Sequence, residues 1–373
     1  MRSLTSIVCF LLLISTCSMA QSPVKGRAIW TKEKANAWYA AQPLLVGANF
    51  VPSTAINELE MWQAETFDTA TIARELKWAA DIGMNTMRVF LHDIAYKQDP
   101  QGFKKRIDIF LKIAARYKIR PLLVLFDSCW DPFPHPGKQH EPAPFLHNSG
   151  WVQSPGADAL KDPRQYPRLQ QYVTDIVRHF RNDNRIVGWD VWNEPDNTNN
   201  SSYGRFEPYN KVELVHNLLE KAFTWVRAQD PTQPITAGIW AGNWASHDSL
   251  RPIEKLMIEQ SDVISFHNYD HPADFEQRVQ WLQRYGRPLL CTEYMSRGNG
   301  STFEGTLPIV KKYKVAAFNW GLVSGKSQTI FPWDSWQKKY TGEPELWFHD
   351  VFRENGTPYK ASEIQAIKNT TGK

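Results

Sequence analysis

Two glutamates stand at the ends of short apolar runs that lie far apart in the sequence. Glu194 closes the run GWDVWNE, where Pro195 follows and stops the extended segment, and Glu293 closes the run LLCTE. Two carboxyl groups can divide one reaction between them: a protonated carboxyl delivers a proton to a leaving oxygen, and an ionised carboxyl attacks the electrophilic carbon or activates a water. This chemistry requires both groups to face one cleft, so the elements that carry them must converge.

Other polar residues recur where the apolar runs end. They are Asn49, Arg88, His92, Asp127, Asn193, His267, Tyr269 and Trp320. In a parallel barrel, the carboxyl ends of all strands open onto one face, so residues in these positions gather around one cleft. Ordinary strand-end polarity is the alternative, but carboxylates on two strands with Arg, His, Asn and Trp on the others favour an active site.

The elements that position these residues alternate along the chain, as is typical of βα units. Predicted strands cover Leu44–Val51, Thr86–Leu91, Pro121–Phe126, Val187–Trp192, Ile235–Trp240, Val263–Asn268, Pro288–Glu293 and Ala316–Trp320. Predicted helices cover Thr69–Asp81, Phe103–Tyr117, Leu169–Phe180, Val212–Ala228, Ile253–Glu259, Phe275–Tyr285, Leu307–Tyr313, and either Pro344–Phe352 or Ala361–Ile367. The pattern predicts the α/β class and a (β/α)8 TIM barrel. An open doubly wound sheet is the rival fold, but no G-x-G-x-x-G follows the first run.

One connection is unusually long. The segment from Ser128 to Tyr166 is rich in Pro, Gly, His and Trp and follows the third predicted strand, so it should overhang the face where the strands end. Shorter loops of this kind are expected at Asp196–Pro208 and Ser324–Pro344. We therefore expect a single barrel domain over residues 21–373, with long loops at its C-terminal face.

The first 20 residues have the layout of a cleavable secretory signal: a basic start, an apolar run and a small residue, Ala20, before the expected cleavage site. Lipid attachment at Cys17 is the alternative, but Thr16 stands where Gly, Ala or Ser is expected. The predicted location is secreted or periplasmic. No later segment has the roughly 18 uncharged apolar residues of a membrane span.

The amino-acid composition limits the kinds of molecule that the protein is expected to bind. Lys and Arg exceed Asp and Glu by only four, 43 against 39, and the basic residues are scattered, so nucleic acid is not an expected partner. The 16 tryptophans are the notable excess, and exposed tryptophan faces suit sugar rings, although ordinary burial is the alternative. Several lie in loop-like sequence, namely Trp130, Trp151, Trp244 and Trp333. Cys129 and Cys291 are expected to be two buried thiols. We expect a monomer.

The motif set resembles clan A glycoside hydrolases, most nearly family 5, the cellulase and mannanase family, over essentially the whole mature length. The family's Asn-Glu pair after strand four resembles Asn193-Glu194, and its glutamate after strand seven resembles Glu293. The resemblance implies a retaining β-glycoside hydrolase that cleaves β-mannoside or β-glucan linkages by double displacement, without a cofactor. It also implies that Glu194 is the acid/base and Glu293 the nucleophile.

The same resemblance implies the substrate-binding residues. Arg88 matches the arginine near the nucleophile, His267 and Tyr269 match the His-x-Tyr of strand six, and Trp320 matches the tryptophan under the sugar. Donors from Arg88 and Tyr269 would favour an ionised nucleophile with a low pKa.

The two residues of the strand-four pair have distinct expected roles. An apolar setting and a neighbouring carboxylate would raise the pKa of Glu194, as an acid catalyst requires. Asn193 is expected to bind the sugar 2-hydroxyl.

The third strand departs from the family pattern. Many family 5 enzymes end this strand with a histidine, whereas this chain has Asp127, followed closely by Trp130, and both are candidate substrate contacts. His92 would supply the missing imidazole, or else it is a strand-end histidine that a backbone carbonyl satisfies. The departure and the long loop favour action on short oligosaccharides or on chain ends, because an overhanging loop closes one end of a cleft.

Other classes of protein fit less well. A metal-dependent barrel hydrolase would need an H-x-H after the first strand or an H-E-x-x-H on a helix, and neither occurs, so no metal site is expected. A non-catalytic carbohydrate-binding barrel would keep the tryptophans but would not need both Glu194 and Glu293. An acyl hydrolase would need a G-x-S-x-G elbow, which the chain lacks.

Overall fold

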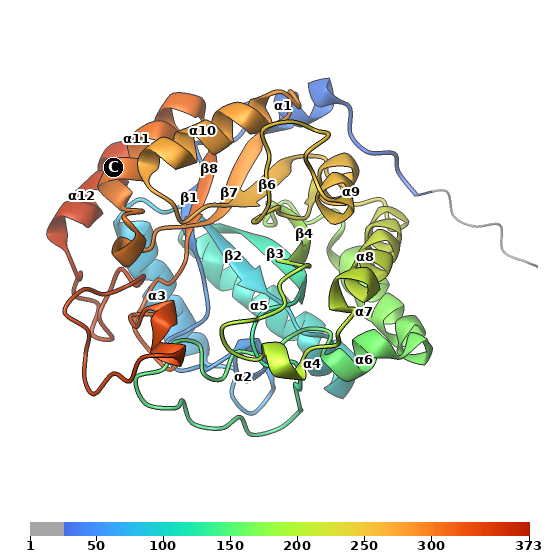
Figure 1. Cartoon of the computed structure of the whole chain (residues 1–373), viewed down its shortest axis with the longest axis horizontal. Helices are drawn as coiled ribbons and strands as arrows, with labels where there is room; N and C mark the ends of the chain where they lie inside the picture. Colours follow the sequence, from blue (N-terminus) through green and yellow to red (C-terminus); the bar gives the residue numbers. More distant parts are fainter. Residues whose placement is uncertain (1–25) are drawn as a thin grey trace, which may run out of the picture.

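Eight parallel strands form the centre of the computed structural model, which describes residues 26–373 (Figure 1). The strands are β1 (Val46–Asn49), β2 (Thr86–Phe90), β3 (Arg120–Asp127), β4 (Gly188–Asn193), β5 (Ile235–Thr236), β6 (Ile264–His267), β7 (Leu289–Tyr294) and β8 (Ala316–Asn319). They pair in the order β5-β4-β3-β2-β1-β8-β7-β6. A parallel bridge between Ile239 and Phe266 joins the chain after β5 to β6 and closes the circle. The predicted (β/α)8 barrel is confirmed, and the predicted signal, with Cys17, lies outside the described residues.

Helices surround the strands on all sides. The outer helices are α3 (Thr69–Asp81), α5 (Pro100–Arg116), α7 (Tyr166–Phe180), α8 (Lys211–Arg227), α9 (Pro252–Gln260), α10 (Pro272–Gln283), α11 (Phe303–Tyr313) and α12 (Ala361–Thr371). Short elements decorate the loops: α2 (Glu58–Trp62), α4 (Asp93–Gln98), α6 (Ala157–Lys161), and the 3-10 turns η1 (Pro163–Gln165), η2 (Gly204–Phe206), η3 (Arg297–Asn299) and η4 (Trp333–Trp336). None of the helices within residues 26–373 is long and apolar enough to cross a bilayer.

The last helix decides between the two positions predicted for it. α12 confirms the position that begins at Ala361, and the alternative at Pro344–Phe352 is wrong. That segment is irregular because its apolar residues pack into the loop layer: Trp347 and Phe348 are buried, and Phe348 N donates to Ile330 O at 2.8 Å.

Local sequence explains the regular elements. In α5, Pro at the first position and the Asp99 side chain, which accepts from Gly102 N at 2.9 Å, start the helix. Its buried residues Phe103, Ile107 and Phe110 recur at helical spacing and face the barrel. Nearly every strand residue is buried, which is why the strands read as continuous apolar runs without alternation.

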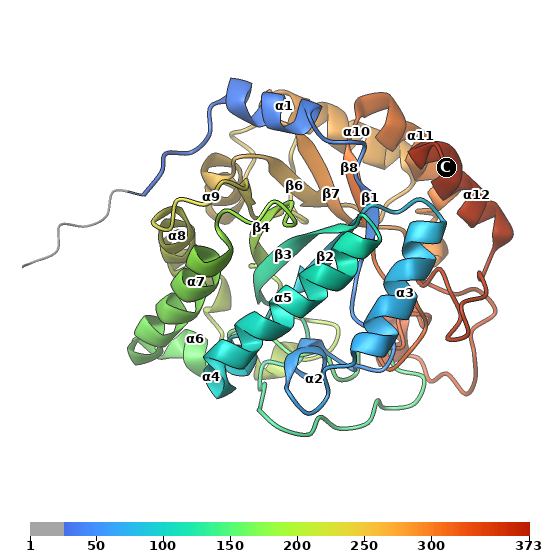
Figure 2. The ribbon, with the colours of Figure 1, turned by 180° about the vertical axis from the view of Figure 1, so that it is seen from behind.

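The two ends of the barrel differ. Figures 1 and 2 show α1 (Lys32–Ala40) at one end and the long loops after β3 and β8 at the other. Behind α1, Trp30 packs on an apolar cluster that includes Leu45, Leu122 and Val263, which plugs the N-terminal end. The functional face is therefore the opposite one, where the strands end.

Candidate active site

A cleft of about 520 Å³ opens at the C-terminal face, and both glutamates line it. Four of the predicted substrate-binding residues line it as well: Trp130, Asn193, Tyr269 and Trp320. The remaining four, Arg88, His92, Asp127 and His267, lie behind this wall and are at most 2 % exposed. The barrel thus brings the two carboxyl groups together in one cavity, and half of the predicted substrate-binding residues lie in a layer beneath it.

Glu293 projects from β7 and receives two hydrogen bonds. Arg88 Nη1 donates to Oε1 at 2.9 Å, and the Tyr269 hydroxyl donates to Oε2 at 2.7 Å. Burial raises the pKa of Glu293 and the neighbouring Glu194 carboxylate adds to this rise, whereas His267, Arg88 and Tyr269 oppose it. The expectation of a low pKa is wrong in direction, because loss of water around the buried carboxyl outweighs the donors.

Glu194 lies just after β4, in a left-handed backbone conformation with φ 41°. Its Oε1 is 2.9 Å from His267 Nδ1, and its Oε2 accepts from Asn197 Nδ2 at 2.6 Å and from Cys129 Sγ at 3.3 Å. Burial raises the pKa of Glu194 to about 7, against the Asn197 and Cys129 donors, which lower it. The raised pKa was expected, and at neutral pH it leaves a large fraction of Glu194 protonated.

The two carboxyl groups are close to each other. One oxygen of Glu194, one oxygen of Glu293 and a ring nitrogen of His267 all lie within 4.8 Å of one another. Burial lowers the pKa of His267 to about 4, so a neutral imidazole stands beside both carboxyls. Within residues 26–373 these three form the one group with a metal-binding donor set, yet each carboxylate already has hydrogen-bond partners.

Arg88 joins the carboxyl pair to the strands below it. Its fully buried guanidinium donates to Glu293, to Asn49 Oδ1 at 3.0 Å, to Asn193 Oδ1 at 2.8 Å and to Asp190 Oδ2 at 2.9 Å. A buried charge of this kind persists only when it is paired, and Asp190 and Glu293 supply the pairing. Arg88 therefore fixes the position of Glu293 from behind.

Asp127 does not reach the cleft as predicted. Its side chain accepts from Trp151 Nε1 at 2.7 Å, Asn193 Nδ2 at 2.9 Å and Cys129 N at 2.9 Å, and it is 1 % exposed. These three donors turn the carboxyl inward, where it holds the Asn193 amide. The predicted substrate contact is replaced by an orienting contact.

His92 also lies away from the cleft. It caps α4, where Ile94 N donates to Nδ1 at 3.1 Å, and its Nε2 is 3.1 Å from Gln153 O. Burial lowers the pKa of this fully buried imidazole to about 4. The structure thus supports a histidine satisfied by a backbone carbonyl, and His92 does not supply the imidazole missing from strand three.

The loop tryptophans divide into two groups. Trp130 and Trp333 line the cleft, as the sugar-platform interpretation expects. Trp151 and Trp244 are buried, and each indole N–H is used inside the protein, by Asp127 Oδ2 and Ala241 O respectively. For these two the alternative of ordinary burial is correct. Cys129 and Cys291 are both buried and free, as predicted.

Several residues of the site were not predicted. Asp190 pairs with Arg88, and its signal was visible: a charged residue inside an otherwise apolar strand. Asn197 and Cys129, which bind Glu194, lie in loops without periodicity, and no sequence signal indicates their direction.

The loops after β3 and β8 are joined over one side of the cleft. Gln328 Nε2 donates to Ala143 O at 2.6 Å and to Leu146 O at 3.2 Å, while Phe145 N donates to Gln328 Oε1 at 2.8 Å. The backbone adds Asn148 N to Ser327 O at 2.9 Å. We call this contact the loop clasp: residues 143–148 held by residues 327–336, including Trp336 Nε1 to His147 O at 2.9 Å.

A closed parallel barrel with two adjacent buried carboxyls after strands four and seven is the arrangement of a glycoside hydrolase. The sequence profile of the cellulase family, glycosyl hydrolase family 5, matches residues 48–338, and the chain belongs to this family. The predicted resemblance is confirmed. The protein is thus an O-glycosyl hydrolase with a carbohydrate substrate.

Solved structures with the same fold include three that act on mannosides according to their descriptions. An exo-β-1,4-mannosidase from Opitutaceae bacterium strain TAV5 has TM-score 0.57 and 17 % identity, over 88 % of this chain and 59 % of that one. A β-1,4-mannanase from the sea hare Aplysia kurodai has TM-score 0.52 and 18 % identity, over 74 % and 87 %. An endo-1,4-β-mannanase from Thermotoga petrophila has TM-score 0.54 and 14 % identity, over 88 % and 99 %. This chain therefore spans about three fifths of the bacterial mannosidase. No curated protein sequence matches it.

Proposed function

We propose that the protein is a retaining β-glycosidase that releases β-linked mannose from the non-reducing ends of oligosaccharides. The observation that carries this proposal is a carboxyl pair with oxygens within 4.8 Å, in a cleft that the loop clasp closes on one side. Retaining enzymes hold their two carboxyls about 5 to 5.5 Å apart, and inverting enzymes about 6.5 to 9.5 Å. The short separation favours attack by a carboxylate over attack by water.

The two glutamates take different steps in this proposal. Glu293 attacks the anomeric carbon as the bond to the leaving oxygen breaks, and Glu194 gives its proton to that oxygen. A water then attacks the glycosyl ester, gives its proton to Glu194 and releases Glu293. Formation of the ester removes the negative charge beside Glu194, so its pKa falls and it becomes an effective base.

The substrate class rests on two kinds of support. Family 5 membership supports an equatorial β-pyranoside, and the three similar structures described above carry mannosidase or mannanase descriptions. A β-glucoside is the second candidate, because the family profile is that of the cellulases. Trp320 would lie under the sugar ring, as an apolar platform at the end of β8.

The side on which the loop clasp lies supports the proposed action on chain ends. Glu194 protonates the leaving oxygen, so the leaving sugar lies toward its neighbours Asn197, Trp240 and Arg251, which also line the cleft. The glycosyl unit that is transferred to Glu293 lies toward Glu293 and Trp320, and the clasp residues His147 and Asn148 line the same cleft with Trp333. In this proposal, a clasp on this side leaves room for one sugar unit and blocks a continuing chain.

Product analysis tests the proposal. Purified protein is incubated with mannohexaose and with aryl β-mannosides and β-glucosides, and proton NMR follows the first anomer released. We expect mannose as the sole early product, appearing as the β-anomer, and slower turnover of the glucosides. Early release of mannobiose or longer products would refute the release of single terminal sugars. An α-anomer as the first product would refute the retaining mechanism.

A further inference from the structure

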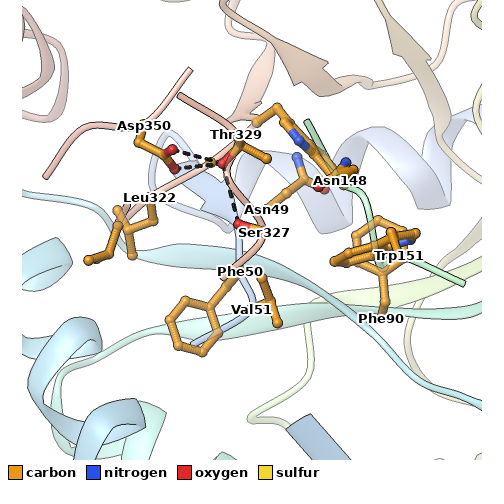
Figure 3. Close-up of a pocket in the computed structure, with 13 residues that line it drawn as sticks. Asn49, Phe50, Val51, Phe90, Asn148, Trp151, Leu322, Ser327, Thr329 and Asp350 are labelled. Carbon is orange, nitrogen blue, oxygen red and sulfur yellow. Dashed lines mark hydrogen bonds between the residues drawn. The ribbon is translucent and has the colours of Figure 1, made fainter. Parts of the chain in front are cut away.

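A second, much smaller cavity shares lining residues with the cleft, and Figure 3 shows this small pocket. Its volume is about 20 Å³, and Asn148 and Trp320 line both this pocket and the cleft. A space of this size holds roughly one water-sized group. The pocket can therefore receive a hydroxyl or hydroxymethyl substituent of a sugar, but not a second ring.

The pocket has a polar edge and apolar walls. In Figure 3 the side chains of Asn148, Ser327, Thr329 and Asp350 lie along one edge, and Phe50 and Val51 lie across from them, with Phe90 and Trp151 to one side. Asp350 accepts from Thr329 Oγ1 at 2.9 and 2.8 Å. A carboxylate has acceptor capacity beyond one hydroxyl donor, so this edge can accept from a further hydroxyl.

Asn148 is the unusual residue of this pocket. It is 1 % exposed, yet neither Oδ1 nor Nδ2 has a hydrogen-bond partner among residues 26–373. Its backbone is held firmly, since its N–H donates to Ser327 O at 2.9 Å and its carbonyl accepts from Trp151 N at 3.2 Å. It also has a positive φ of 46°. An unpaired buried amide in a strained backbone destabilises the free protein, which favours a role in binding over a role in folding.

We propose that this pocket receives a hydroxyl-bearing substituent of the terminal sugar, on the side of the ring remote from the scissile bond, and that the Asn148 amide binds it. Nδ2 donates to the hydroxyl oxygen and Oδ1 accepts its proton, which satisfies both unpaired atoms. The hydroxyl on C4 or C6 meets the description. Asn148 is then a specificity-determining residue, and the inference rests on the proposed release of terminal sugars.

The kinetic test pairs a substitution with a change in the substrate. Wild type and Asn148→Ala are assayed on an aryl β-mannoside and on its 4-deoxy and 6-deoxy analogues. We expect kcat/KM on the parent to fall by about 10- to 100-fold in the variant, and by a similar factor for one deoxy analogue with wild type. The variant assayed on that same analogue should show no further loss of kcat/KM, because the substitution and the missing hydroxyl remove the same contact. Unchanged kinetics in the variant, or fully multiplicative losses with both analogues, would overturn the proposal.

A stability comparison separates binding from folding. Asn148→Gly removes the amide and accepts the positive φ, so its Tm should equal or exceed that of wild type. Asn199 is the matched control: it has φ 50° and is 6 % exposed, but its amide binds Trp130 N at 2.8 Å and Ser128 O at 2.9 Å. Asn199→Gly should therefore lower Tm. An equal loss in both variants would overturn the binding role of Asn148.

The inference and the proposed function fail in different measurements. Mid-chain cleavage of mannohexaose by wild type would refute the release of terminal sugars, and with it the position of the bound hydroxyl. Terminal release by wild type, together with multiplicative losses in the kinetic test, would refute the Asn148 contact alone.

Discussion

Removal of the Asn197 amide should move the alkaline limb of the pH profile of kcat/KM to higher pH. Asn197 Nδ2 donates to Glu194 Oε2 at 2.6 Å, and this contact lowers the pKa of Glu194 against the effect of burial, which raises it to about 7. Glu194 delivers a proton in the first step of the proposed mechanism, so kcat/KM falls as pH rises through its pKa in the free enzyme.

The size of the shift follows from the hydrogen bond. A bond to a charged acceptor contributes about 1.5 to 3 kcal/mol and a bond to a neutral one about 0.5 to 1.5 kcal/mol, so the difference is roughly 1 to 1.5 kcal/mol. One pKa unit corresponds to about 1.36 kcal/mol. Asn197→Ala destabilises the ionised form of Glu194, so the alkaline limb should move up by about one unit, toward pH 8.

The assay is kcat/KM on an aryl β-mannoside between pH 4 and about 10. Asn197→Asp should move the limb further upward, because a second carboxylate penalises ionisation of Glu194. Asn182→Ala, an exposed site remote from the cleft, is the matched control and should leave the limb unchanged. A limb that stays in place or moves to lower pH in Asn197→Ala would refute Glu194 as the titrating proton donor.

Three further predictions concern the nucleophile, the clasp and the metal alternative. Glu293→Ala should abolish turnover of an aryl β-mannoside, and added azide should restore it with inverted stereochemistry, seen as an α-glycosyl azide by NMR; absence of rescue counts against the nucleophile. Gln328→Ala removes three hydrogen bonds of the loop clasp, each contributing about 0.5 to 1.5 kcal/mol. Chromatography should then detect mannobiose and longer products from mannohexaose, and an unchanged product pattern would show that the clasp does not block the cleft. Treatment with a chelator should leave kcat unchanged, whereas a loss reversed by zinc would assign a metal to Glu194, His267 and Glu293.

The sequence was sufficient to predict the barrel and the convergence of the two glutamates. Parallel strands buried on both faces leave continuous apolar runs, and the residue after each run must lie at the C-terminal face. This reasoning located Glu194 and Glu293 because topology alone brings strand ends together. Arg88 and His267 lie within β2 and β6, and they contact the carboxyls from the side of the core.

The orientation of strand-end residues was beyond sequence reasoning. Asp127 and His92 occupy the predicted strand-end positions, yet Trp151 and Gln153, from the long loop after β3, bind them on the inner side. The direction of the Glu293 pKa shift depends on a balance between burial and four neighbours, which spacing does not determine. Asn148 and Gln328 lie in loops without periodicity, so the contacts of Asn148 with Ser327 and of Gln328 with Phe145 are visible only in three dimensions.

Covalent labelling tests the central claim most directly. The reagent is a 2-deoxy-2-fluoro-β-mannoside with an activated leaving group. The fluorine slows both the formation and the hydrolysis of the glycosyl ester, and the activated leaving group speeds formation alone, so the ester accumulates. Intact mass spectrometry should show the addition of one fluoroglycosyl unit, and peptide mapping should place it on Glu293. A label on Glu194 or any other residue, or turnover of the reagent without a label, would contradict the account.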